Sequence, residues 1–181
     1  MISIGMNPYQ GLISEADFKR GKGMTPGNRG SVCVNGDLKE FVAVKLNASA
    51  TWVNGTIMQI DANGVGAAAI VATNPAATLN PRLGILVFGS ATATQTTVAT
   101  VYGFVQIYGP VLARVSTTVS LVGVQLVLGA GSGVLINGAG VASTESQLQG
   151  ITAVGTQSVT GLLNVFLNYP RLSGVPDVNL A

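Results

Sequence analysis

The sequence predicts an all-β fold, a small β-barrel or β-sandwich with an extended N-terminal arm. Apolar runs recur roughly every 8–12 residues between glycine, asparagine and proline, a spacing typical of barrels and sandwiches. Asn-Gly pairs, which favour tight hairpin turns, occur at 35–36, 54–55 and 63–64. No segment carries a long apolar period of 3.6 residues, so we expect little helix.

The chain is predicted to divide into an arm, residues 1–30, and a barrel or sandwich domain, residues 31–181. The arm contains GKGMTPGNRG at 21–30, which is too rich in glycine to hold a helix and is expected to be a loop or extended. Residues 14–20 fit one helical turn capped by Ser14, with acids early and bases late. We expect the arm to contact a neighbouring subunit as a second, tethered attachment.

From about residue 31 the β signals dominate, and Cys33 is expected to be a small apolar residue within a strand. The further expected strands are 41–46, 56–60, 66–73, 84–88, 96–108, 111–119, 121–128, 133–137, 151–154 and 159–169. In residues 97–107, small or weakly polar residues alternate with large ones. Such a sheet can pack on both faces, and we expect a partner subunit to cover it because it lacks charges that would discourage aggregation.

The charge content is low for a protein in water. Hydrophobic residues make up 48% and charged residues 9% of the chain, against about 25% charged in an average domain, and the mean hydropathy is +0.50. Ten of the sixteen charged residues lie in residues 1–45, so we expect the rest to be largely enclosed by protein. The longest apolar tract, 121–136, is too short and too rich in glycine for a membrane helix. The N-terminus lacks the basic and apolar regions of a signal peptide.

The sequence offers little catalytic or cofactor chemistry. It has no histidine and one cysteine, so zinc and similar metal sites are not expected. The glycine-rich run 129–133 is interpreted as a strand connection, because further glycines shortly after it prevent the helix of a nucleotide-binding loop. Ser132 has no histidine base, and Asp61 and Glu145 lie in turn-like, polar sequences. We predict no catalytic residue, cofactor or metal, and no enzymatic activity.

Five residues are predicted to bind a protein partner: Lys19, Arg20, Lys22 and Arg29 of the arm, and Trp52. Trp52 follows a loop of small polar residues and is expected to be exposed. Acidic neighbours offset the basic cluster, and the net charge of the chain is only +2. Contact with an acidic protein surface is therefore favoured over direct contact with nucleic acid. Binding of nucleic acid requires more positive charge and a series of aromatic side chains that stack on the bases.

Five of the other aromatic residues are expected mainly in the core, with some as interface anchors. They are Tyr102, Phe104, Tyr108, Phe166 and Tyr169.

The weakly charged body, rich in Ala, Thr, Gly and Val, resembles the head decoration (cement) proteins of tailed bacteriophages. The extended arm before the Asn35-Gly36 turn, and the closing segment GLLNVFLNYPR at 161–171, are similar to those of virion β-proteins. This resemblance implies a small, commonly trimeric barrel or sandwich on the outer capsid surface, where subunits of the major capsid protein meet. It also implies reinforcement of the shell against internal DNA pressure. Since neither a signal peptide nor a membrane span is expected, we predict that the protein is made and assembled in the host cytoplasm.

Two alternatives stay open. The chain also fits a tail-tube, fibre or minor shell subunit, although the long repeats of a fibre stalk are not visible. A carbohydrate-binding β-sandwich ranks last, because it needs exposed aromatics among clustered acids or amides, and carboxylates are few here. Only six charges fall in residues 46–181, so we predict an obligate homo-oligomer, with a trimer as the expected state.

Overall fold

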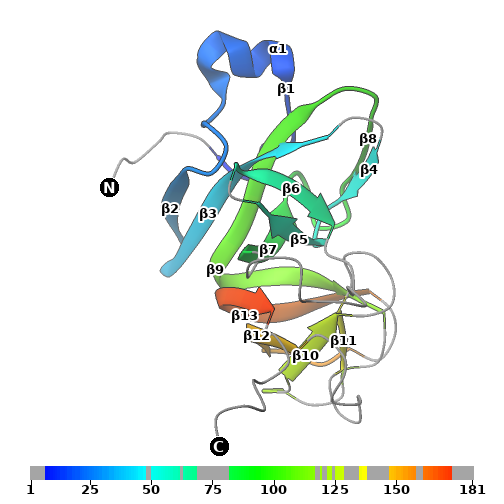
Figure 1. The fold of residues 1–181 in the computed structure, drawn as a ribbon. Helices are drawn as coiled ribbons and strands as arrows, with labels where there is room; N and C mark the ends of the chain where they lie inside the picture. The colour runs from blue at the N-terminus through cyan, green and yellow to red at the C-terminus, as the bar shows by residue number, and fades with distance from the viewer. Residues whose placement is uncertain are drawn as a thin grey trace, which may run out of the picture.

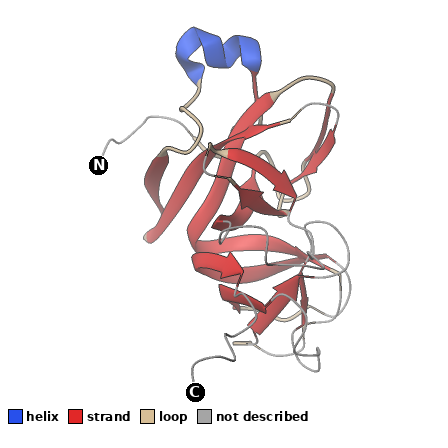
Figure 2. Ribbon diagram, viewed as in Figure 1, coloured by secondary structure: helices blue, strands red, loops and turns tan. Residues whose placement is uncertain are grey.

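Most of the described residues lie in strands, with one short helical segment (Figure 2). The computed structural model describes residues 7–47, 50–61, 63–68, 82–116, 119, 122–123, 125–128, 135–137, 147–157 and 161–172. The helix α1 (Glu15–Asp17) continues as a π-helical turn, Phe18–Lys22. Over the described residues, no helix has the length and apolar character needed to cross a membrane. The all-β prediction is confirmed.

The strands of the described part are numbered along the chain. They are β1 (Ile13–Ser14), β2 (Arg29–Val34), β3 (Asp37–Leu46), β4 (Ala50–Val53), β5 (Ile57–Ile60), β6 (Val65–Ala68), β7 (Arg82–Val87), β8 (Thr94–Thr97), β9 (Val101–Val115), β10 (Gln125–Leu128), β11 (Leu135–Asn137), β12 (Gln147–Ala153) and β13 (Gly161–Leu172). All but β4 and β8, which pair with each other, belong to one sheet.

Five strands of the upper lobe in Figure 1 hydrogen-bond in a closed ring. β3 pairs with β9, β9 with β7, β7 with β5 and β5 with β6, all antiparallel, and β6 returns to β3 in parallel. β2 pairs with the first part of β3, before the residues of β3 that pair with β6. The two strands are joined by a hairpin turn at Asn35-Gly36, as the sequence predicted. Ring closure pairs both edges of these strands, which removes edges that would otherwise aggregate.

A second ring is built on the other end of β9. β9 pairs with β13, β13 with β12, β12 with β10 and β10 with β11, and β11 returns to β9 through one parallel pair, Leu135 with Val115. Figure 1 shows β9 running down the upper lobe and turning into the lower one. The expectation was a single barrel or sandwich, whereas the pairings close two rings that share one strand.

The long strand β9 corrects the predicted strands 96–108 and 111–119. Thr94–Thr97 form the separate strand β8, and β9 runs unbroken through Gly109 and Pro110. Gly109 has a φ of 92°, a left-handed conformation that glycine adopts without strain. A Cβ at this position would overlap the carbonyl oxygen of Leu38. Glycine therefore lets the strand bend sharply without ending.

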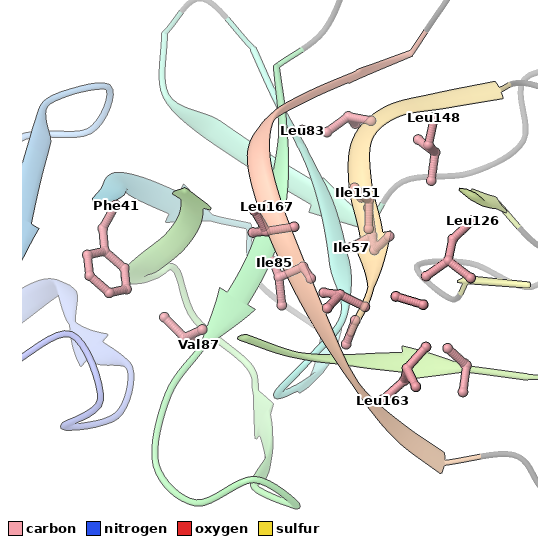
Figure 3. Packing of buried hydrophobic residues seen from close by; sticks show 14 of the residues in the cluster. Phe41, Ile57, Leu83, Ile85, Val87, Leu126, Leu148, Ile151, Leu163 and Leu167 are labelled. Carbon is pink, nitrogen blue, oxygen red and sulfur yellow. The ribbon is translucent and has the colours of Figure 1, made fainter. Parts of the chain in front are cut away.

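Both faces of the first ring's wall are buried. Val42 and Val44 of β3 pack in one cluster with Val105 of β9, whereas their neighbours Phe41 and Ala43 belong to a second cluster. Figure 3 shows this second cluster extending from Phe41 to the second ring; its labelled members there include Leu126, Leu148, Ile151 and Leu163. Both faces of the sheet are covered, as expected. At these strands, however, other residues of the same chain cover them, and not a partner subunit.

Residues 7–30 fold back onto the body. The helical turn begins at Ser14, whose Oγ accepts a hydrogen bond from the Asp17 N–H at 3.1 Å, as the sequence predicted. The Phe18 ring stacks on Tyr102 with 3.9 Å between centroids. Farther along, the Gly27 N–H donates to the Ala43 carbonyl at 2.8 Å. The described part of the predicted arm thus packs on its own chain, and its contact with a neighbouring subunit stays a prediction.

Gln106 fastens the bend of β9. Its side chain is fully buried, and its Nε2 donates to the carbonyl oxygens of Tyr108 and Pro110, both at 3.0 Å. These two carbonyls flank Gly109, so one amide holds both sides of the bend. The Gln106 Oε1 has no partner among the described residues. Burying it is unfavourable, and the two bonds of Nε2 act against that cost.

We expect Gln106→Met to lower the free energy of unfolding by about 1–3 kcal/mol, because two partly buried carbonyls lose this donor while the volume is nearly kept. Removing the unpaired Oε1 offsets part of this loss. Chemical denaturation measures the change, with Gln149→Met, an exposed position of β12, as the matched control. Equal stability of the two variants would show that Gln106 does not secure the bend.

Candidate functional site

The predicted cations of the helical turn are paired within their own segment. Lys19 Nζ lies 3.0 Å from the Glu15 carboxylate, and Lys22 Nζ lies 3.0 Å from Asp17. Arg20 lies 3.8 Å from Asp17. Hydrogen bonds from Lys22 and then Ser14 hold the pKa of Asp17 below its usual value. The structure brings these three cations together, but their charge is largely neutralised locally, and their role in binding a partner stays a prediction.

The other two predicted site residues lie elsewhere. Arg29 is exposed at the start of β2, outside the helical turn. Its neighbours are residues of other strands, with which it lines a cleft. Trp52, expected to be exposed, is instead only 7% accessible. It lies on β4 rather than in a loop, it packs in the cluster with Val42, and its Nε1 donates to Thr97 Oγ1 at 3.1 Å. That expectation is wrong because the strand pairing of β4 and β8 turns the indole inward.

An aromatic patch, Tyr108, Phe166 and Tyr169, lies where the two rings meet. Tyr108 comes from β9, and the other two come from β13, which pairs with β9. Phe166 packs edge-on against Tyr108 with centroids 5.6 Å apart, and the Tyr169 ring lies 5.3 Å from Tyr108. Phe166 is 38% and Tyr169 40% exposed. Contact among the three aromatic side chains fixes their orientation, while one side of the patch stays open to solvent.

The sequence carries a signal for this patch that the prediction of core aromatics missed. Along β13, Val165 and Leu167 are buried, whereas Asn164 and Asn168 are exposed. Side chains alternate between the two faces of a strand, so Phe166 points to the same outward face as the two asparagines. An aromatic residue between outward-facing polar residues is a more specific sign of a binding surface than the loop context of Trp52.

Tyr169 ties the patch to the first ring. Its hydroxyl donates to Glu40 Oε1 at 3.0 Å, and this hydrogen bond, followed by partial loss of hydration, raises the pKa of the phenol above its usual value. The backbone φ of Tyr169 is 48°, a left-handed value that is unusual for a residue other than glycine and more so before a proline. Such strain persists where surrounding contacts hold it in place, as at binding sites.

The surface chemistry fits recognition. Cys33 lies within β2, as expected, and is exposed. Within the described ranges, no three side chains of His, Cys, Asp or Glu gather to hold a metal ion. The patch offers aromatic area and two phenols, and Arg29 lies near Tyr169. Aromatic residues and arginine are enriched among the residues that dominate binding at protein interfaces.

We expect Glu40→Gln to lower the pKa of Tyr169, because a neutral amide no longer penalises the phenolate. A raised pKa stabilises the folded protein below the ordinary value of about 10, and this contribution is lost as the pH rises through the folded-state pKa. Tyrosinate absorbance during alkaline titration measures the shift. The part of the absorbance change that Tyr169→Phe removes belongs to Tyr169. A titration curve of Glu40→Gln identical to that of the wild type would contradict the pairing.

No family model matches the sequence, and no curated protein does. Among solved structures, the chain is similar to the N base of the head fibre gp8.5 of bacteriophage phi29. The TM-score is 0.41 with 9% sequence identity, and the likeness covers 74% of this chain and 99% of that chain.

Proposed function

We propose that this chain is a structural protein of a tailed-bacteriophage virion that binds the outer surface of the capsid and stabilises it. In this proposal its partner is the major capsid protein. The observation that carries it is the aromatic patch, three large rings held together and partly exposed on a body with few charges. The phage assignment rests on the resemblance of the composition to head decoration proteins.

The patch is suited to binding protein. Interface hot spots are enriched in tyrosine and arginine, and preformed aromatic anchors lose little side-chain entropy on binding. Exposed Leu38 belongs to the β3 strand whose Glu40 holds Tyr169, so apolar surface continues beside the patch. Surrounding residues would exclude water from these anchors in the complex.

We further propose that the role is mechanical and not catalytic. The chain contains no histidine and only seven carboxylates from Asp and Glu, so it has little acid–base machinery. Stabilisation follows from linkage, because a ligand that binds only the intact shell shifts the equilibrium toward it. At a hundredfold excess over Kd this amounts to about 2.7 kcal/mol per site, and it accumulates over the many sites of a capsid.

We expect Phe166→Ala to weaken binding to capsids by about thirtyfold, which corresponds to about 2 kcal/mol for an interface anchor. Val98→Ala is the control, since Val98 is 88% exposed and lies outside the patch. Capsids stripped of this protein are incubated with each variant, and bound protein is measured by sedimentation. Equal binding of both variants would remove the patch from the interface.

The stabilising role has its own test. Virions with and without the protein are heated while DNA release is followed, and release should begin at a higher temperature when the protein is present. Equal release temperatures, or labelling that locates the protein in the tail, would contradict the proposed function.

We also propose that the protein is a homotrimer. Analytical ultracentrifugation at micromolar concentration should give the mass of a trimer, because the weakly charged surface outside residues 1–45 favours association. A stable, soluble monomer under these conditions would contradict this state.

A further inference from the structure

A cleft of about 430 Å³ lies beside the aromatic patch and shares Tyr169 with it. Three arginines line it: Arg29 from the start of β2, Arg82 from the start of β7 and Arg171 from the end of β13. They are three of the five arginines in the chain and are widely separated in sequence. All three are exposed, so their guanidinium groups are accessible to a ligand. We call this feature the arginine cleft.

The arginine cleft places like charges side by side. Arg82 and Arg171 are direct partners across the antiparallel pairing of β7 and β13. Like charges opposite each other on neighbouring strands are destabilising. This is also the one place where the described parts of β7 and β13 pair, so the repulsion lies at the contact between the two rings.

No carboxylate in the described part of the chain forms an ion pair with these arginines. The ion pairs found there are those of Lys19, Arg20 and Lys22. The carboxylate of Glu40, which lies near the cleft, accepts the hydrogen bond of Tyr169. Glu40 offsets at most one of the three positive charges, so the arginine cleft keeps a net positive charge and has donors available to a ligand.

The shape of the cleft selects among anions. Its lining also includes Leu83, Ile107 and Pro170, all buried, so an apolar floor lies beneath the charged rim. A guanidinium binds carboxylate or phosphate with paired hydrogen bonds. An apolar floor suits the methylene stem of an acidic side chain, and the volume falls in the range of about 300–1,000 Å³ for sites that hold small groups. Nucleic acid instead needs a basic track that follows several phosphates.

We propose that the arginine cleft binds an acidic segment of the partner protein, with Glu or Asp carboxylates held by Arg29, Arg82 and Arg171. This inference rests on the proposed function, because the partner that covers the aromatic patch would bring its acidic segment to the cleft. The bound carboxylates relieve the repulsion between Arg82 and Arg171. The cleft thereby adds charge specificity to the apolar contact of the patch.

The test uses the full chain and a fluorescein-labelled hexaglutamate peptide with blocked termini. Fluorescence anisotropy should show saturable binding to the wild type and none of hexaglutamine. Arg82→Met and Arg171→Met should each weaken binding at least tenfold, the loss expected for one charge-assisted hydrogen bond. Arg114→Met, which removes an arginine of β9 outside the cleft, should change it less than twofold.

Thermal unfolding of the same variants serves as the control for correct folding. Since each removes one of two like charges, neither Arg82→Met nor Arg171→Met should lower the thermal midpoint of unfolding. No binding of hexaglutamate, or equal weakening by Arg114→Met, would overturn the inference. Tighter binding of a thymidine hexanucleotide or of inorganic phosphate, abolished by the same two substitutions, would also overturn it by assigning the cleft to phosphates.

Capsid binding separates this inference from the proposed function. If Phe166→Ala loses capsid binding while both cleft variants keep it, the inference fails and the proposed function stands. If the wild type binds hexaglutamate through the cleft but does not bind capsids, the proposed function fails and the carboxylate site stands.

Discussion

The participation of β9 in two rings is the constraint on which the rest of the structure depends. Its first half pairs with β3 and β7, and its second half pairs with β13. A strand that serves both rings must change direction without leaving buried backbone groups unpaired. Gly109 supplies the left-handed backbone for this turn, and the amide of Gln106 supplies the donor for the carbonyls on either side. The shared strand pairs directly with β3, β7, β11 and β13, and the remaining strands of both rings pair with these four or with one another.

The arrangement accounts for much of the unusual composition. Residues 41–44 and 83–88 are buried without interruption, because one face looks into the first ring's cluster and the other packs toward the second ring. Such a strand needs no outward polar residues, so its low charge content does not require a partner subunit. Composition alone therefore overstates the surface that another protein must cover. The aromatic patch is the stronger reason to expect association, because its rings are exposed at a defined place.

The junction of the rings is also where binding chemistry gathers. The bend in β9 places Tyr108 against β13, and Tyr169, in a strained conformation, reaches across to Glu40. β13 accommodates this irregularity opposite Gly150, where a Cβ would overlap the Asn168 carbonyl oxygen. The same irregular end of β13 places Arg171 opposite Arg82. The surface at this junction is therefore less regular, and more distinctive, than the surface of regular strands.

The sequence by itself determined the β class, the turn capped by Ser14 and the hairpin at Asn35-Gly36, because each depends on local turn chemistry and side-chain alternation. Alternation in β13 also marks Phe166 as outward-facing, once the strand is known. Only the tertiary structure decided that β9 continues through Gly109, that Trp52 is buried and that three distant arginines meet in one cleft. Those outcomes follow from strand pairing between remote segments, whose free energy depends on packing and hydrogen bonds that no local stretch of sequence contains.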